Sequence, residues 1–292
     1  MTHDDLQPQP QLAHLHGHDV CFVDRPGDGT PLLLVHGVGS SVETWGDVPQ
    51  RLAAAGHRVV ALDLLGHGGS SAGHGDFSLG AHANTMRDLM DHLAIARAHL
   101  VGHSLGGGVS LQFAYQYPER VASMTLVSSG GLGPDLGVAL RAAALPGADL
   151  VLRAASRPHV LRAGSFADRV LGRFGRQLPL FSASAVQRLQ ALQDDQRRAA
   201  FLATLRSVVG PEGQRVSAVD KLTTLDPHRV LIVWGERDPM VPIQHGRAAH
   251  EQLPGSRFVV IEGAGHHPHT HEPEVFTNAL LDHLDQLAVT PA

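Results

Sequence analysis

The chain has 292 residues, of which 43% are hydrophobic and 17% are charged, and its formal net charge at pH 7 is −5. A chain of this length and composition can bury a large core, either as one domain or as a core with an insertion. No stretch approaches the roughly 20 uninterrupted apolar residues of a membrane span, and the polar start lacks the apolar centre of a secretory signal. We therefore expect a soluble, cytoplasmic protein without membrane or nucleic-acid partners.

The first elements are predicted from residues 20–35, which resemble an antiparallel hairpin in their alternation of apolar runs and turn residues. The only cysteine, Cys21, lies in the first of these strands and cannot form an internal disulfide. We expect it to be a buried structural thiol.

The core strands are predicted from six short apolar runs that each end near Gly, Ser or Asp, as buried parallel strands do. They comprise residues 31–37, 57–66, 98–104, 120–129, 228–238 and 256–266, with helical stretches at 75–95 and 109–120. This alternation predicts an α/β fold with a doubly wound, mostly parallel sheet. In such a sheet the functional site lies at the carboxyl ends of the strands.

The middle of the chain has a different composition. Residues 131–225 are rich in Ala, Leu and Arg at helical spacing, which predicts a helical insertion, or lid, between two parts of the core at 1–130 and 226–292. From residue 130 to residue 225 there are 13 basic and 7 acidic residues, whereas the remainder has 10 basic and 21 acidic residues. The insertion is therefore positive and the core negative.

A serine motif, Gly102-His103-Ser104-Leu105-Gly106, lies between a predicted strand and a predicted helix. This is the context that a G-x-S-x-G nucleophile elbow requires. Glycines permit a turn too tight for side chains, so we expect a strained Ser104 with its hydroxyl in a cleft. The backbone N–H of Leu105 would then face a developing oxyanion at the start of a helix.

A serine hydroxyl is a poor nucleophile unless a histidine accepts its proton and an acid orients that histidine. His266 follows the last predicted strand and a glycine turn, where a loop brings a base to the carboxyl edge of the sheet. The alternatives are His267, His269 and His271. A metal site in this run is disfavoured, because no cysteine or second group of acidic ligands accompanies it.

The acid is predicted to be Asp238, which follows the penultimate strand and precedes a proline and an apolar pair. Asp135 is the alternative, because an acid can also be offered from the end of the preceding strand. Glu236 is interpreted as a solvated loop carboxylate.

Five segments in this order resemble the motifs of the α/β-hydrolase family with a lid. They are "HGVGSS" at 36–41, "DLLGHGGS" at 63–70, "GHSLGG" at 102–107, "WGERDPMVP" at 234–242 and "GAGHHPHTHEPE" at 263–274. The resemblance implies a catalytic triad of Ser104, Asp238 and His266, and an oxyanion hole formed by the backbone N–H groups of Val38 and Leu105.

The same resemblance assigns supporting roles to other residues. Gly39 is a less favoured oxyanion donor than Val38, and His36 shapes the loop without taking part in the chemistry. Asp63, His67 and Ser70 resemble the structural turn of the family. The family requires no cofactor.

The expected reaction is the hydrolysis of a carboxylic ester, a thioester or a lactone in a small-molecule substrate. Haloalkane dehalogenases and epoxide hydrolases use an aspartate nucleophile, whereas this chain has Ser104. Hydrolases that cleave a C–C bond in dienoic ring-fission products are an alternative, although they commonly carry a tryptophan where His267 stands. A non-hydrolytic tailoring enzyme and a ligand receptor that use the same pocket are further alternatives.

The lid is expected to set specificity through apolar side chains above Ser104, namely Phe166, Phe174 and Phe181, with Leu178 and Leu180. The alternative is that these side chains only pack the lid onto the core. The positive charge of the insertion suggests that arginines draw an anionic substrate toward the cleft, and the candidates are Arg141, Arg153, Arg162, Arg169 and Arg173. The alternative is that they lie on solvated helix faces.

Overall fold

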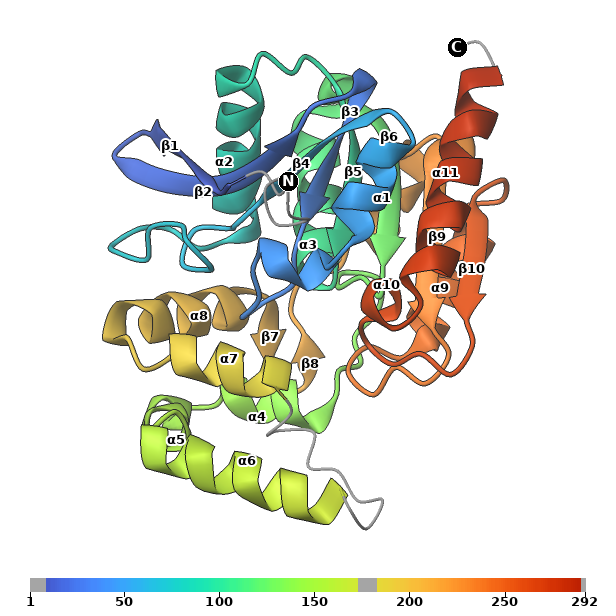
Figure 1. The fold of residues 1–292 in the computed structure, drawn as a ribbon. Coiled ribbons are helices and arrows are strands. Elements are labelled where there is room, and N and C mark those ends of the chain that lie inside the picture. The colour runs from blue at the N-terminus through green and yellow to red at the C-terminus, as the bar shows by residue number, and fades with distance from the viewer. Residues whose placement is uncertain (1–8, 173–182, 290–292) are drawn as a thin grey trace.

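The computed structural model describes residues 9–172 and 183–289, which form an eight-stranded sheet with helices on both faces (Figure 1). The strand order is β1-β2-β4-β3-β5-β6-β9-β10; β1 and β2, and β2 and β4, pair antiparallel, and the other pairs are parallel. This confirms the doubly wound, mostly parallel sheet. The strands are β1 Gln11–Leu15, β2 His18–Arg25, β3 Asp28–Val35, β4 His57–Leu62, β5 Ala98–His103, β6 Val121–Val127, β9 Val230–Gly235 and β10 Arg257–Ile261.

The hairpin predicted over residues 20–35 is wrong. β2 forms its hairpin with β1, through the two-residue turn His16-Gly17, whose φ angles of 48° and 83° are those that a tight hairpin turn requires. β3 instead lies between β4 and β5 and pairs with both in parallel. The reason is burial, because residues 32–35 are apolar on both sides of the strand and so need helices on both faces.

Alternate side chains of the central strands enter two separate cores. Leu33 and Val35 pack on the face that is covered by α2 Leu79–His92, α3 Leu105–Gln116 and α9 Ile243–Gln252. Leu32 and Leu34 pack on the other face, against α1 Val48–Ala54 and α11 Pro273–Val289. The period of two along a strand therefore decides which helices each residue contacts.

Between β6 and β9 the chain forms the helical insertion, which lies as a separate layer below the sheet in Figure 1. Leu161, Leu189 and Leu192 form a small core of its own. The elements are α4 Val138–Ala144, α5 Ala148–Ala155, α6 Pro158–Gly172, α7 Ala183–Ala191, α8 Asp195–Val208 and the short hairpin of β7 Val209–Gly210 and β8 Gly213–Gln214. Within the described ranges, no helix has the length and apolarity needed to cross a membrane.

Part of the positive charge of the insertion is neutralised by ion pairs within the insertion. Arg198 is buried, and its guanidinium pairs with Asp149 at 2.7 Å and with Asp195 at 2.6 Å. The pair with Asp149 connects α5 to α8, whereas the pair with Asp195 lies within α8. The remaining short elements of the described residues are α10 Pro268–His271 and the 3-10 helices η2 Val42–Trp45, η3 Pro118–Arg120, η5 Val219–Thr224 and η6 Pro227–Arg229.

Two buried histidines contact each other beneath α2. The rings of His67 and His82 lie 6.4 Å apart, and both side chains are almost fully buried. Burial lowers the pKa of each ring to about 3, because the charged imidazolium would lose its hydration. Both rings are therefore neutral in the folded protein at pH 7.

The free energy of unfolding should fall when the pH is lowered from 7 to 5. In the unfolded chain these rings bind protons below about pH 6.5, whereas in the folded protein they do so only near pH 3. The stability of the folded protein is therefore fully retained above pH 6.5 and is progressively lost as the pH falls toward 3. At pH 5 each ring costs about 2 kcal/mol. His82→Phe should reduce the loss by that amount in urea unfolding, whereas the exposed His74→Phe should not. Equal pH dependence in all three proteins would contradict the prediction.

Candidate active site

Ser104 lies on the turn between β5 and α3. Its φ of 53° and ψ of −115° are rare for a residue with a side chain, and its exposed fraction is 7%. A Cβ on Gly102 would lie 2.4 Å from the carbonyl oxygen of Gly106, and one on Gly106 would lie 2.1 Å from that of Val35. The start of α3 therefore packs directly on the backbone of the sheet, which is why the motif needs both glycines.

A chain of hydrogen bonds connects Ser104, His266 and Asp238. The Ser104 Oγ lies 3.0 Å from Nε2 of His266, and Nδ1 of His266 lies 2.8 Å from Oδ2 of Asp238. Because an ionised carboxylate only accepts, Nδ1 carries the hydrogen and Nε2 is free to accept from the serine hydroxyl. The three residues follow β5, β9 and β10, and so they meet at the carboxyl edge of the sheet.

The carboxylate of Asp238 is ionised although it is fully buried. Burial by itself would raise its pKa, but the hydrogen bond and charge of His266 and two backbone N–H groups outweigh that effect, and the pKa lies below its usual value. The N–H groups of Met240 and Val241 donate to its Oδ1 at 2.8 and 3.0 Å. The acid is thus held in one orientation by its own loop.

The other candidate residues do not join this chain of hydrogen bonds. In the described part of the chain, Ser104 Oγ and the Asp238 carboxylate are hydrogen-bonded to no histidine other than His266. The side chain of Asp135 is 76% exposed and lies 3.6 Å from Nε2 of His245. Glu236 accepts a hydrogen bond from the backbone N–H of Gly263 and so supports the turn that follows β10.

Two backbone N–H groups beside Ser104 are available to a ligand. Val38 and Leu105 both line the cavity that contains Ser104, and among the described residues neither N–H has a protein acceptor. Leu105 is the first residue of α3, where the helix dipole favours negative charge. A Cβ on Gly37 would lie 3.1 Å from Cβ of Ser104, so this loop passes directly over the serine. Gly39 faces the ring of Phe201 instead.

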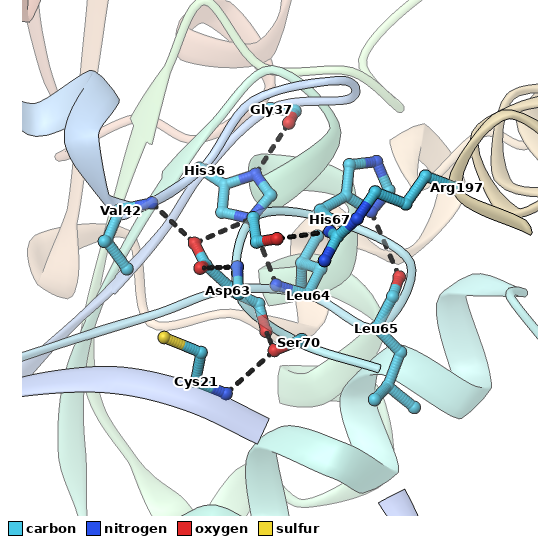
Figure 2. Close-up of polar contacts among 12 residues, drawn as sticks. Cys21, His36, Gly37, Val42, Asp63, Leu64, Leu65, His67, Ser70 and Arg197 are labelled. Carbon is cyan, nitrogen blue, oxygen red and sulfur yellow. Dashed lines mark hydrogen bonds and ion pairs between the residues drawn. The ribbon is translucent and has the colours of Figure 1, made fainter. Parts of the chain in front are cut away.

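The loop that carries Val38 is held by a buried polar network (Figure 2). His36 donates from Nδ1 to the carbonyl of Gly37 at 2.7 Å and accepts the N–H of Leu64 at Nε2 at 3.0 Å. Asp63 accepts the N–H of Val42, which follows the same loop. Burial lowers the pKa of His36 to about 4, so it holds the loop as a neutral donor and acceptor.

The turn at 63–70 extends this network to two other segments. Ser70 donates to the carbonyl of Asp63 and accepts the N–H of Cys21, and Arg197 of α8 donates to the carbonyl of Gly68 (Figure 2). Cys21 is buried, and desolvation is the main cause that raises its pKa to about 11, so its thiol stays protonated at neutral pH. The turn therefore joins the sheet, the loop and the insertion.

Two cavities border these residues. The first has a volume of about 50 Å³ and contains Ser104, with apolar walls from the core and from the insertion, the latter being Leu136, Leu140, Leu205, Val208, Val209 and Val216. The second has a volume of about 870 Å³, contains His266 and is lined by both apolar groups and polar side chains. Its walls are the loops around Ser41 and Thr270 and the α7 residues Gln187, Arg188 and Ala191.

Of the predicted apolar lining residues, only Phe166 lies within the described part of the chain. Phe166 is 67% exposed and lines neither cavity, because it lies on the outer side of α6 while α4 and α8 reach toward Ser104. Phe174, Phe181, Leu178, Leu180 and Arg173 lie outside the described residues. Arg141 donates to the carbonyl of Pro211, and the exposed Arg153, Arg162 and Arg169 line neither cavity.

The family model for the alpha/beta hydrolase fold matches residues 30–273. The chain belongs to the α/β-hydrolase family. A protein of Mycobacterium tuberculosis is 38% identical over 97% of this chain and 83% of its own length. The 2-hydroxy-6-oxo-6-phenylhexa-2,4-dienoate hydrolase of Burkholderia cepacia is 28% identical over 88% of each chain.

Among solved structures, a thermophilic esterase from Thermogutta terrifontis superimposes with a TM-score of 0.69 and 26% identity, covering 96% of this chain and 99% of the esterase. The family and these hydrolase-named relatives identify this α/β hydrolase as an enzyme of the hydrolase type. Within the described residues, no group of three or more His, Cys, Asp or Glu side chains is arranged to hold a metal ion.

Sequence reasoning missed His103, the residue directly before Ser104. Its Nε2 donates to the carbonyl oxygen of His266 at 2.8 Å, and its ring lies 4.9 Å from that of His266 and 4.7 Å from that of His269. Burial, assisted by these neighbouring rings, holds its pKa well below the usual value. In this hydrolase, a neutral His103 thus ties the loop of His266 to the serine turn.

The close packing at the elbow predicts opposite effects of the same substitution at two glycines. Gly106→Ala should lower the free energy of unfolding by about 2 kcal/mol or more, because its Cβ would meet backbone that cannot move aside. Gly80→Ala, in α2 with no neighbour closer than 3.9 Å, should raise it by up to about 1 kcal/mol. Urea unfolding measures both, and a harmless Gly106→Ala would refute the packing argument.

Proposed function

We propose that this hydrolase cleaves a carboxylic ester, thioester or lactone through a triad of Ser104, His266 and Asp238. The observation that carries the proposal is the continuous hydrogen-bond chain from Ser104 Oγ through His266 to Asp238, on a strained turn beside two free backbone N–H groups. Nucleophile, base, orienting acid and oxyanion donors are the parts that acyl transfer needs.

The reaction begins when Ser104 Oγ attacks the carbonyl carbon of the substrate and His266 Nε2 takes the hydroxyl proton. The negative charge that develops on the carbonyl oxygen is stabilised by the N–H groups of Val38 and Leu105. His266 then gives its proton to the leaving alcohol or thiol, which departs as the C–O or C–S bond breaks. Water, deprotonated by the same histidine, hydrolyses the acyl-enzyme and frees the serine.

Asp238 has two tasks in this scheme. It keeps the hydrogen of His266 on Nδ1, so that Nε2 faces the serine as an acceptor, and its negative charge stabilises the imidazolium that forms. The depressed pKa of Asp238 suits both tasks, because the carboxylate remains ionised over the pH range in which histidine is neutral. We also propose that residues 131–225 act as the lid, since the insertion supplies one wall of the Ser104 cavity.

Cleavage of a C–C bond in a dienoic substrate is the second candidate, and the similarity to the Burkholderia cepacia hydrolase favours it. It would use the same serine and histidine. His267 occupies the position after His266 at which such enzymes commonly carry tryptophan, which favours ester hydrolysis. Parallel assays of a nitrophenyl ester and a 2-hydroxy-6-oxo-dienoate distinguish the two reactions.

Ser104→Ala should lower kcat for a short-chain nitrophenyl ester about 10³-fold or more, because only binding and the oxyanion donors remain. In urea unfolding, the free energy of unfolding of the variant should lie within about 1 kcal/mol of that of the parent protein. Mass spectrometry should show that a serine-directed phosphonate adds once, at Ser104. Near-normal turnover by the alanine variant would defeat the assignment.

The two candidate acids should differ sharply. Asp238→Asn should lower kcat about 10³- to 10⁴-fold, because the amide favours the wrong tautomer of His266 while keeping the geometry. Asp135→Asn is the matched control, and its exposed side chain should make the effect less than about threefold. Steady-state kinetics with one ester tests both variants, and the reverse pattern would transfer the role to Asp135.

A further inference from the structure

The two cavities at the proposed triad differ in size and in chemistry. The cavity beside Ser104 measures about 50 Å³ and has apolar walls on nearly every side. The cavity beside His266 measures about 870 Å³, and its walls include the polar and charged side chains of Glu43, Arg188 and His267. Ser104 does not border the large cavity, and His266 does not border the small one. The two parts of a substrate would therefore meet different surroundings.

The chemistry decides which part enters which cavity, and this step rests on the proposed function. The acyl carbon must lie at Ser104 with its oxygen at the N–H groups of Val38 and Leu105, and all three residues line the small cavity. The leaving group must receive its proton from Nε2 of His266. His266 lines the large cavity, so the leaving alcohol or thiol extends into it.

The size of the small cavity limits the acyl group. One water-sized atom needs about 10–15 Å³ of such volume, and a cavity of about 150 Å³ accommodates benzene. About 50 Å³ therefore holds about three or four non-hydrogen atoms. Leu140 of α4 and Leu205 of α8 are the two leucines on helices of the insertion that line this cavity.

The large cavity suits a polar group of considerable size. On the core side it is lined by the loop of Ser41 and Glu43 and by Thr270, whose hydroxyl donates to the carbonyl of Thr44. On the insertion side it is lined by α7, whose Gln187 donates to the carboxylate of Glu43. Ala191, one turn further along α7, leaves room in this wall.

We propose that the substrate is an ester or thioester of a short apolar acyl group, of two to four carbons, with a large polar alcohol or thiol. Leu140 and Leu205 set the upper limit of acyl length. The large cavity between α7 and the loops of Ser41 and Thr270 binds the leaving group, whose polar atoms meet side chains such as Glu43 and Arg188. This hydrolase therefore selects its substrate on both sides of the scissile bond.

The acyl limit is tested with nitrophenyl esters from acetate to octanoate, which share one leaving group. The value of kcat/KM should be highest from acetate to butyrate and fall about 100-fold or more by octanoate, since one methylene in an apolar pocket changes it about 10-fold or more. Leu140→Ala, and independently Leu205→Ala, should raise the ratio of octanoate to butyrate at least about tenfold. Leu161→Ala, which is as buried in the insertion as Leu205 but does not line the cavity, should leave that ratio unaltered.

The leaving-group side is tested with acetyl thioesters of ethanethiol, N-acetylcysteamine and pantetheine. The value of kcat/KM should rise about tenfold or more from the smallest to the largest thiol, because the added polar atoms reach the large cavity. Ala191→Trp should lower the pantetheine to ethanethiol ratio at least about fivefold by filling that cavity. Ala154→Trp, on the exposed side of α5, is the matched control.

The outcomes separate this inference from the proposed function. If Ser104→Ala abolishes hydrolysis but the parent enzyme cleaves octanoate as well as butyrate, the acyl limit is refuted while the triad stands. A pantetheine to ethanethiol ratio near one, unaffected by Ala191→Trp, refutes the assignment of the large cavity. If Ser104→Ala retains activity, the triad itself fails.

Discussion

The close contact between the start of α3 and the backbone of β3 is the constraint on which the site depends. The methylene of Gly106 rests against the carbonyl of Val35, and no side chain fits between them. With α3 held this close, the chain has to turn from β5 into the helix at one residue, and Ser104 takes up the strain in its backbone angles. The same closeness brings the loop of Gly37 over the serine, so the proposed nucleophile and the proposed oxyanion donors are placed by the same contact.

The other parts of the site are tied to this turn by hydrogen bonds that use backbone atoms. His103 holds the carbonyl of His266, His36 holds that of Gly37, and the loop of Asp238 supplies two N–H groups to its own carboxylate. Parallel strands bring these loops to one edge of the sheet, but they do not fix the conformation of each loop. The buried hydrogen bonds restrict the remaining conformational freedom of these loops. The groups of the site therefore need little rearrangement during a reaction.

Much of the fold and the residues of the candidate triad could be predicted from the sequence, because buried strands and the serine motif are local patterns. The partner of a strand is not local: β3 pairs with β4 and β5 because residues 32–35 need cover on both faces, which outweighed its proximity to β2. His103 was missed because its partner is a backbone carbonyl 163 residues away. Phe166 was expected to face Ser104 but is exposed, and aliphatic residues such as Leu140 line the Ser104 cavity instead, because helix orientation decides which side chains face Ser104.

The histidine-rich surroundings of His266 are compatible with catalysis only because the neighbouring rings are neutral. His103 and His267 lie 4.9 and 5.3 Å from the His266 ring, and a charge on either would oppose the imidazolium by roughly 3 kcal/mol at an effective dielectric constant of 20. Burial lowers the pKa of His267 to about 4 and that of His103 further, so both are uncharged at neutral pH. His266 differs from both in its hydrogen bond of 2.8 Å to the ionised Asp238. The pairing with a carboxylate therefore distinguishes the proposed base from its neighbours.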